Sequence, residues 1–282
     1  MISESIMEQN AGKVSPGDYI ALPRERMVEG GKKIDSLYLA GLVFGDGHLT
    51  NEQVQFVNNE VRLIEEFNRS LQCLSSHKVT NIPYDGFTRS EIWDPKLAGK
   101  LNADFDIPFG NKTRSFRINR RILESDSGSI SELLRGLFDC EAHVNTHTNT
   151  IEFVTSNRNL SSVLPFMLLR FGIISHSHSQ QRDGKGNSGP YFKISISGKR
   201  NLEKFADSIG FEHPQKMYKL GLIVSNSGDP YDVLPGIGPL LRRARVENSL
   251  TQQELARKIG RRTRSIIESY ETEKRAISRE VL

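Results

Sequence analysis

Two stretches of nine residues decide how this chain folds: residues 39–47 read LAGLVFGDG, and residues 134–142 read LRGLFDCEA. They share their first, third and fourth letters, and each has an acid at its eighth position, Asp46 in the first and Glu141 in the second. Because the two acids are 95 residues apart, the pattern indicates an internal repeat of about that length.

Small residues stand four apart in both stretches, Gly41 and Gly45 in the first and Gly136 and Cys140 in the second. Residues four apart share one face of a helix, and small side chains let two helix axes approach closely. We therefore predict two helices that pack against each other and bring the two acids together at their C-terminal ends.

The same order of periodicities accompanies each stretch: an apolar helix, an alternating strand, a second helix, two strands around a turn and a third helix. We interpret each half as αββαββα, with six of its seven elements bounded by the periodicities, which predicts an α+β fold made of two similar halves. The expected elements lie at 34–44, 53–57, 61–74, 78–82, 87–93 and 95–103 in the first half and at 130–138, 151–154, 157–171, 174–182, 191–196 and 201–209 in the second.

Composition divides the chain of 282 residues into five expected segments. They are an N-terminal extension at 1–33, repeats at 34–128 and 129–224, a linker at 225–235 and a helical module at 236–282. The whole chain has a net charge of +4, but residues 241–282 hold eleven Lys or Arg and only six Asp or Glu, a net of +5. A basic module of this kind indicates a polyanionic partner.

Composition also excludes several classes of protein. Two cysteines cannot form the disulfide framework of a small secreted scaffold, and the first ten residues lack the pattern of a signal peptide. No stretch approaches the roughly 18 apolar residues of a membrane-spanning helix. We expect a monomeric, cytoplasmic protein with no signal peptide and no membrane partner.

With the two motifs and the strand and helix after each, residues 34–225 resemble the LAGLIDADG (dodecapeptide) homing endonucleases of the intein-associated type. The resemblance implies a pseudo-two-fold fold with two saddle-like antiparallel sheets, and hydrolysis of both strands of a long double-stranded DNA site. It also implies that Asp46 and Glu141 bind Mg²⁺, with Mn²⁺ or Ca²⁺ as substitutes, together with the backbone carbonyls of Gly45 and Cys140.

Electrostatics supports this interpretation of the two acids. Carboxylates at helix C-termini are disfavoured by the helix dipoles and by each other. A divalent cation that prefers oxygen ligands relieves both effects. Metal ions that bridge the acids and a phosphate stabilise the attacking and leaving oxygens of a hydrolysis.

Two lysines recur at matching places in the repeats. Residues 106–112 read DIPFGNK and residues 210–216 read GFEHPQK, so Lys112 and Lys216 end the two stretches. In intein-type members of the resembled family an active-site lysine follows such a Gly or Pro turn. The resemblance implies that both lysines are catalytic and polarise the attacking water or stabilise the phosphorane charge.

The outward faces of the strands are the expected DNA-binding surface. In the strands at 53–57 and 151–154, apolar residues alternate with residues that face away from the helices. Gln, Lys and Tyr can contact base edges or phosphates, and Glu152 can accept a hydrogen bond from a cytosine amino group. The predicted contacts are Gln53, Gln55, His143, Asn145, Glu152, Arg182, Tyr191 and Lys193.

The C-terminal module resembles the helix-turn-helix of phage-repressor-type proteins. The matching residues are LTQQELA at 250–256, Gly260, and SIIESYE at 265–271, and TQQE at 251–254 forms a capping box that opens a helix. The resemblance implies a small all-α domain whose third helix enters the major groove. The residues expected to contact DNA there are Arg261, Arg262, Thr263 and Arg264.

Near the N-terminus, SPGDYIALP at 15–23 resembles the stretch that leads from an intein's splicing domain into its endonuclease. An active intein needs a nucleophile at its first residue and Asn at its last. This chain begins with Met1 and ends with Leu282, so we do not expect it to splice as it stands. It is expected to be a free-standing relative or an endonuclease region cut from an intein.

Three alternatives stand beside the endonuclease. Bacterial sporulation-type regulators combine a degenerate LAGLIDADG domain with a helix-turn-helix and bind DNA without cutting it, although this chain keeps both acids and both lysines. RNA maturases use the same fold to help an intron fold. A structural zinc is the third, because Cys140, His143 and His147 have ligand-like spacing.

Overall fold

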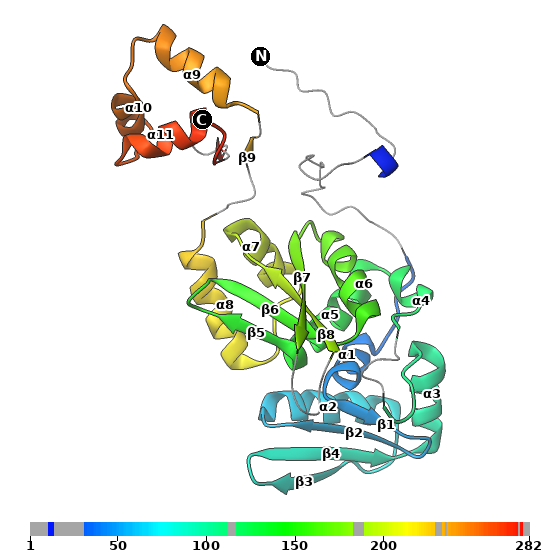
Figure 1. Cartoon of the computed structure of the whole chain (residues 1–282). Coiled ribbons are helices and arrows are strands. Elements are labelled where there is room, and N and C mark those ends of the chain that lie inside the picture. The colour runs from blue at the N-terminus through cyan, green and yellow to red at the C-terminus, as the bar shows by residue number, and fades with distance from the viewer. Residues whose placement is uncertain are drawn as a thin grey trace. The chain divides into compact units, whose positions relative to one another are not determined.

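The computed structural model describes residues 11–13, 31–111, 117–182, 189–228, 233–234, 236–275 and 277–278. The chain divides into two compact units between Ser227 and Gly228 (Figure 1). The larger unit ends at Ser227, and the smaller one contains the described residues 11–13 and those from Gly228 onward. Near the N-terminus, a single 3₁₀ turn is described at Ala11–Lys13. No helix among the described residues is long and apolar enough to cross a membrane.

The first repeat has the predicted order of helices and strands. The helix expected from residue 34 begins only at Leu37, because Ser36 adopts a left-handed backbone with φ of 67°. Asp94 caps the third helix by accepting hydrogen bonds from the backbone N–H groups of the first turn, which Pro95 opens. The elements are α1 (Leu37–Gly45), β1 (Gly47–Leu49), β2 (Gln53–Asn58), α2 (Val61–Leu74), β3 (Thr80–Tyr84), β4 (Phe87–Trp93), α3 (Pro95–Phe105) and the short α4 (Arg120–Leu123).

The second repeat has the same order of helices and strands, and its last helix, α8, is longer than α4 of the first repeat. Its elements are α5 (Ser127–Glu141), β5 (Ala142–Asn145), β6 (Thr150–Thr155), α6 (Arg158–Leu169), β7 (Ser175–Arg182), β8 (Gly189–Ile196), α7 (Lys199–Ser208) and α8 (Pro214–Asn226). The periodicities do not predict α8, which begins at Pro214, a residue favoured in the first helical turn. Because α8 continues to Asn226, the first two residues of the expected linker at 225–235 are helical.

Each repeat contributes one four-stranded antiparallel sheet. The strand orders are β1-β2-β4-β3 and β5-β6-β8-β7, so the two sheets share one topology. Val54 and Phe56 on β2 and Ile151 and Phe153 on β6 are fully buried, and the residues between them face the other side. One apolar core extends through both repeats. The predicted duplicated αββαββα fold is confirmed.

Helices α1 and α5 pack side by side where the two repeats meet (Figure 1). A side-chain carbon built on Gly41 would lie 2.6 Å from the carbonyl oxygen of Leu133, and one built on Gly136 would lie 2.5 Å from a carbonyl oxygen of α1. A carbon built on Gly45 would overlap the side chain of Cys140. The two backbones therefore approach as closely as the small residues predict, and larger residues would force them apart.

From Gly228 onward, the described part of the smaller unit contains three helices and one strand pair. They are β9 (Val233–Leu234), α9 (Gly238–Glu247), α10 (Gln252–Lys258), α11 (Arg264–Glu271) and β10 (Ile277–Ser278), with β9 and β10 antiparallel. Helix α10 begins with the predicted capping box of Thr251 and Glu254. Helix α11 begins at Arg264. The small core of this unit consists of Ala256, Ile267, Tyr270 and Ile277.

Candidate active site at the paired helices

The two acids of the motifs lie at equivalent ends of the helix pair. Gly41 contacts Gly136 and Gly45 contacts Cys140, so α1 and α5 run in the same direction. Asp46, the next residue after Gly45, is the C-cap of α1, and Glu141 is the last residue of α5. The Asp46 carboxylate accepts a hydrogen bond of 2.8 Å from the side-chain amide of Asn58 at the end of β2.

Lys216, in the first turn of α8, reaches the C-terminal end of α5. Its ammonium group donates hydrogen bonds to the carbonyl oxygens of Phe138 at 3.2 Å, of Asp139, and of Cys140 at 3.5 Å. These oxygens belong to the last turn of α5, where the helix dipole is negative, and the Phe138 carbonyl also accepts the backbone N–H of Ala142. The end of α5 is therefore a place where this chain binds a positive charge.

Burial lowers the pKa of Lys216, because the charged ammonium loses solvation. Cys140, Asp139, Asp46 and Glu141 act in the opposite direction and favour the charged form. Each motif acid is therefore within electrostatic reach of this lysine. Lys112, the other predicted lysine, lies outside the described residues.

The residues at this end of the helix pair fit a hard divalent cation. Asp46 and Glu141 supply carboxylate oxygens, and the carbonyls of α5 already accept hydrogen bonds from a cation, the Lys216 ammonium group. Among the described residues, no three side chains of His, Cys, Asp or Glu cluster closely enough to hold a metal by themselves. A magnesium ion held here would complete its shell with water, backbone and phosphate oxygens, which is its usual preference.

The three residues considered for zinc have different surroundings. Cys140 packs against Gly45, and its thiol, which donates to the carbonyl of Leu42 at 3.9 Å, has a pKa raised well above the usual value by burial. His143 is exposed on β5, and His147 is exposed in the turn that follows. The cysteine thus serves the helix contact, and the two histidines lie on the surface.

Asp139 is a buried polar residue that the sequence analysis does not assign to the site. It occupies the sixth position of the second motif, where the first motif has Phe44. Its carboxylate accepts the backbone N–H groups of Glu212 at 3.2 Å and His213 at 3.0 Å, and the hydroxyl of Tyr38 at 3.0 Å. Burial raises its pKa to about 6, although these hydrogen bonds act in the opposite direction. The signal in the sequence is an acid at a motif position that is apolar in the first repeat.

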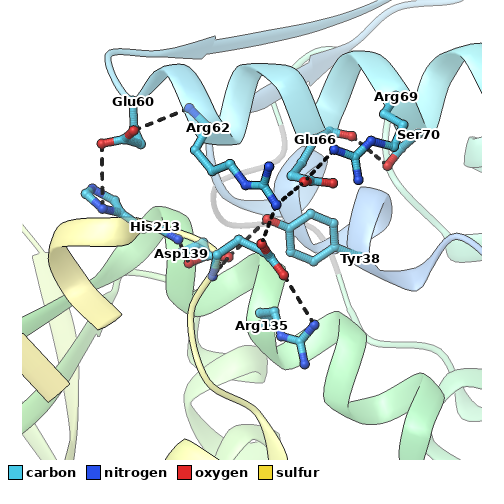
Figure 2. A network of polar contacts seen from close by, with 10 residues as sticks. Tyr38, Glu60, Arg62, Glu66, Arg69, Ser70, Arg135, Asp139 and His213 are labelled. Carbon is cyan, nitrogen blue, oxygen red and sulfur yellow. Dashed lines mark hydrogen bonds and ion pairs between the residues drawn. The ribbon is translucent and has the colours of Figure 1, made fainter. Parts of the chain in front are cut away.

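A polar network surrounds Asp139 and crosses from the first repeat to the second (Figure 2). Glu212, just before α8, pairs with Arg62 of α2 at 3.4 Å and with Arg135 of α5 at 3.6 Å. His213 approaches Glu60 at 3.8 Å. The segment between α7 and α8 is therefore held by side chains from both repeats. Two further ion pairs on α2 complete the network, Arg62–Glu66 and Arg69–Glu66.

The outward face of the first sheet combines polar and aromatic residues, and it includes the Arg89–Glu91 ion pair at 3.1 Å. Gln53 and Gln55 lie on this face as predicted and are half-buried, with the Gln55 amide donating to Glu91 at 3.3 Å. Three aromatic residues that the sequence analysis does not single out share the face. They are Tyr84 and Phe87, whose rings stack 4.9 Å apart, and Trp93, which is 56% exposed.

The outward face of the second sheet is polar. Glu152 on β6 pairs with Lys193 on β8 at 3.2 Å, which accounts for an acid on a surface expected to meet phosphates. His143 is directly opposite Glu152, and Tyr191 donates its hydroxyl to Gln180 of β7. Strand pairing adds two histidines of β7 that the sequence analysis does not predict for this face. Asn145, His176 and His178 also lie on this face. Arg182 ends β7, and its side chain is outside the described part.

The predicted DNA contacts of the smaller unit lie around the start of α11. Arg261 and Arg262 are in the turn before the helix, Thr263 is its N-cap and Arg264 its first residue. All four are exposed. The amide of Gln253 on α10 donates to the carbonyl of Arg262 at 3.3 Å, so the first turn of α10 supports the segment that carries these side chains.

Comparison with known families identifies one domain in the chain. Residues 129–210 match the model of the LAGLIDADG-like domain, so the second repeat carries such a domain. This interval contains Asp139 and Glu141.

Several curated relatives match most of this chain with a small part of their own. A probable translation initiation factor IF-2 of Thermococcus kodakarensis is 28% identical over 83% of the chain and 20% of its own length. A replication factor C small subunit of Methanocaldococcus jannaschii is 28% identical over 80% of the chain and 12% of its own. A glutamine–fructose-6-phosphate aminotransferase of the same organism is 26% identical over 67% and 17%. The chain thus spans a fifth or less of these relatives.

Solved structures with a similar fold have low sequence identity to the chain. I-DmoI in complex with DNA and Mn has a TM-score of 0.48 at 17% identity, covering 62% of this chain and 94% of its own. The homing endonuclease I-DmoI has also been solved with Mg and with Ca. Full-length DUF199/WhiA from Thermatoga maritima has a TM-score of 0.44 at 14% identity, covering 86% of this chain and 91% of its own.

Proposed function

We propose that the chain is a site-specific endonuclease that hydrolyses both strands of a long double-stranded DNA target with Mg²⁺. The observation that carries this proposal is the parallel helix pair, which ends in Asp46 and Glu141 with the buried ammonium group of Lys216 within electrostatic reach of both. Two carboxylates and a lysine at the end of a helix pair suit phosphodiester hydrolysis better than they suit simple packing.

Asp46 and Glu141 would hold the magnesium ion, together with the backbone carbonyls of Gly45 and Cys140. When bound, this ion would supply positive charge to the scissile phosphate and to the leaving oxygen. Asn58 holds the carboxylate of Asp46 through its 2.8 Å hydrogen bond. Lys216, and Lys112 in the equivalent place of the first repeat, would stabilise the negative charge that develops on the phosphate.

The two outward sheet faces and the smaller unit would bind the DNA. Gln53 and Gln55 on one face, and the row around Lys193 on the other, offer hydrogen-bonding groups for base edges and phosphates. The α10–α11 pair would act as a tethered helix-turn-helix, with exposed arginines at the start of α11. Because one monomeric chain carries both faces and a single smaller unit, its target would be asymmetric.

We also infer that the chain is related to the endonuclease regions of inteins. Relatives named as an initiation factor, a replication factor subunit and an aminotransferase share no activity by name, and the chain matches at most 20% of each. This pattern supports an element that resides within unrelated host proteins. The intein-like stretch at 15–23 lies outside the described residues.

Selection from a duplex library with random sites tests the proposed function. The purified chain with Mg²⁺ should cut one sequence class across both strands, and EDTA should abolish cutting. A site that is enriched by binding and stays intact in Mg²⁺ and Mn²⁺ would contradict the endonuclease and favour the non-cleaving regulator. Splicing of an added intron RNA, with no DNA cutting, would favour the maturase.

A further inference from the structure

We propose that Asp139, oriented by Tyr38, is a positioning residue that holds Lys216 at the end of the helix pair. The inference rests on the proposed endonuclease function for the role of Lys216. The anchor, meaning the hydrogen bonds between the Asp139 carboxylate and the backbone before α8, does not depend on that function. Asp139, at the sixth position of the second motif, would then have a role that the apolar Phe44 at the same position of the first motif cannot have.

The anchor consists of hydrogen bonds from a side chain of α5 to the backbone before α8. Asp139 accepts the N–H groups of Glu212 and His213, and its side chain is almost completely buried. His213 is the N-cap of α8 and makes no side-chain capping bond itself. A carboxylate that accepts backbone N–H groups at a helix start satisfies donors that otherwise lack partners and is favoured by the helix dipole.

A second contact joins the same two segments in the opposite direction. Lys216 is the third residue of α8, and its ammonium group donates to the carbonyls of Phe138, Asp139 and Cys140. The side chain of α5 therefore holds the backbone of α8, and the side chain of α8 holds the backbone of α5. Releasing the first contact frees the turn on which Lys216 stands.

Tyr38 links this arrangement to the first repeat. Its hydroxyl donates to the Asp139 carboxylate at 3.0 Å, and Tyr38 belongs to α1 whereas Asp139 belongs to α5. The hydrogen bond restricts the rotamer of Asp139, so both N–H groups before α8 find an acceptor. Phe44 has no acceptor atom to offer at the equivalent place, and the first repeat therefore lacks this anchor.

Chemical labelling of lysines tests the anchor without DNA or metal. The full-length chain is treated with an amine-reactive reagent, and the labelling rate of Lys216 is measured by mass spectrometry relative to that of Lys219 on the same helix. Asp139→Asn should raise this ratio about tenfold, since it removes one charge-assisted hydrogen bond to the backbone and also a charge that favours the Lys216 ammonium. Tyr38→Phe keeps that charge and should raise the ratio severalfold through the position of Lys216 alone.

Glu212→Gln is the matched control. It weakens the ion pairs with Arg62 and Arg135 in the same segment but leaves both backbone N–H groups bonded to Asp139. The labelling ratio of Lys216 should stay at the wild-type value. A ratio that rises as much in Glu212→Gln as in Asp139→Asn would overturn the anchor, because any loosening of the segment would then expose the lysine.

A double-mutant cycle tests whether Asp139 acts through Lys216. Asp139→Asn should slow DNA cleavage at least tenfold in the wild-type chain and have almost no further effect in Lys216→Ala. Equal effects in both backgrounds would overturn the positioning role. If Asp139→Asn unfolds the chain, Tyr38→Phe takes its place, and an unchanged Lys216 labelling ratio in that variant overturns the proposal. The labelling ratio of Lys216 could rise in Asp139→Asn although the wild-type chain cuts no DNA. That result would support the anchor and reject the endonuclease.

Discussion

The two repeats share one topology but present different surfaces. The outward face of the first sheet carries the stacked rings of Tyr84 and Phe87 beside the Arg89–Glu91 ion pair. The outward face of the second carries the Glu152–Lys193 ion pair beside histidines such as His143. Buried faces must fit the same helix pair, so their alternating apolar pattern is retained in both halves. Outward faces have no such constraint. Packing therefore preserves the duplication, and the two halves have diverged in the side chains on their outward faces.

The helix pair shows the same contrast between shared packing positions and divergent side chains. Gly41 and Gly136 face each other and cannot accept a side chain on either helix. Two positions before the acids, in contrast, Phe44 and Asp139 differ completely, because one packs in the core and the other accepts hydrogen bonds from the turn before α8. Equivalent positions in the repeats are therefore alike where backbones touch and unlike where side chains meet new partners.

Breaking the helix contact should have the largest effect on stability. Gly41→Ala places a carbon 2.6 Å from a carbonyl oxygen, and we expect it to lower the free energy of unfolding by about 3 kcal/mol. Gly99→Ala, in α3 with no atom within 4 Å of the new carbon, is the control and should raise it by about 0.5–1 kcal/mol. Urea unfolding monitored by circular dichroism measures both. Equal effects would mean that α1 and α5 do not pack as closely as described.

Removing the smaller unit should weaken DNA binding without removing the chemistry. A chain that ends at Ser227 keeps both acids and both lysines and should fold, because the two units are separately compact. Its affinity should fall about 100-fold through the loss of effective concentration. The slope of log K against log salt should become shallower, and the footprint should shrink at one flank only. Unchanged affinity, slope and footprint would leave the helix-turn-helix without a role in binding.

Substitution of Lys112 or Lys216 tests the two halves of the proposed active site separately. Lys216→Ala should slow cleavage about 10- to 100-fold with little change in affinity, since its ammonium group contacts the carbonyls at the end of α5. Lys112→Ala should also slow cleavage. Lys219→Ala, on the same helix as Lys216, is the control and should cut at the wild-type rate. A loss of affinity in proportion to rate would identify either lysine as a phosphate anchor instead.

The two sheet faces should differ in how they contribute to binding. Trp93→Ala on the first sheet should weaken binding by about 1 kcal/mol with an unchanged salt slope, because it removes an apolar contact. Lys193→Ala on the second should weaken binding and reduce the salt slope by about one, because it removes a phosphate contact. Phe166→Ala, an exposed aromatic on α6 away from both faces, should change neither quantity. Identical salt responses of the two sheet variants would remove the distinction between the faces.

Much of the fold could be predicted because its signals are local. The helix at Val61–Leu74 has both predicted ends, and Glu60 caps its start. The strand at Phe87–Trp93 also has its predicted bounds. Strand β1 has only three residues, too few for a periodicity, and exists through its pairing with β2. The sequence pattern does not predict helix α8, because its apolar residues are split between the core and an exposed face that includes Tyr218 and Leu222.

The candidate site was predictable where the repeat itself carries the signal. Both acids and Lys216 stand at matching places of the two halves, so the duplication marks them. Asp139 has partners 73, 74 and 101 residues away, and only the folded chain brings them together. The aromatic residues on the outward face of the first sheet were missed for a similar reason, since strand pairing places Trp93 and Tyr84 on one side.

The central claim is that Asp46 and Glu141 form one active centre at the end of the helix pair. The most direct measurement compares binding and cleavage of one selected DNA duplex by the wild-type chain, Asp46→Asn and Glu141→Gln in Mg²⁺. Each substitution keeps the shape of the side chain and removes the charge of a metal ligand, so cleavage should fall about 10³-fold or more. Affinity should stay within about threefold, because phosphate and base contacts lie elsewhere. Cleavage by either variant at nearly the wild-type rate would contradict the claim.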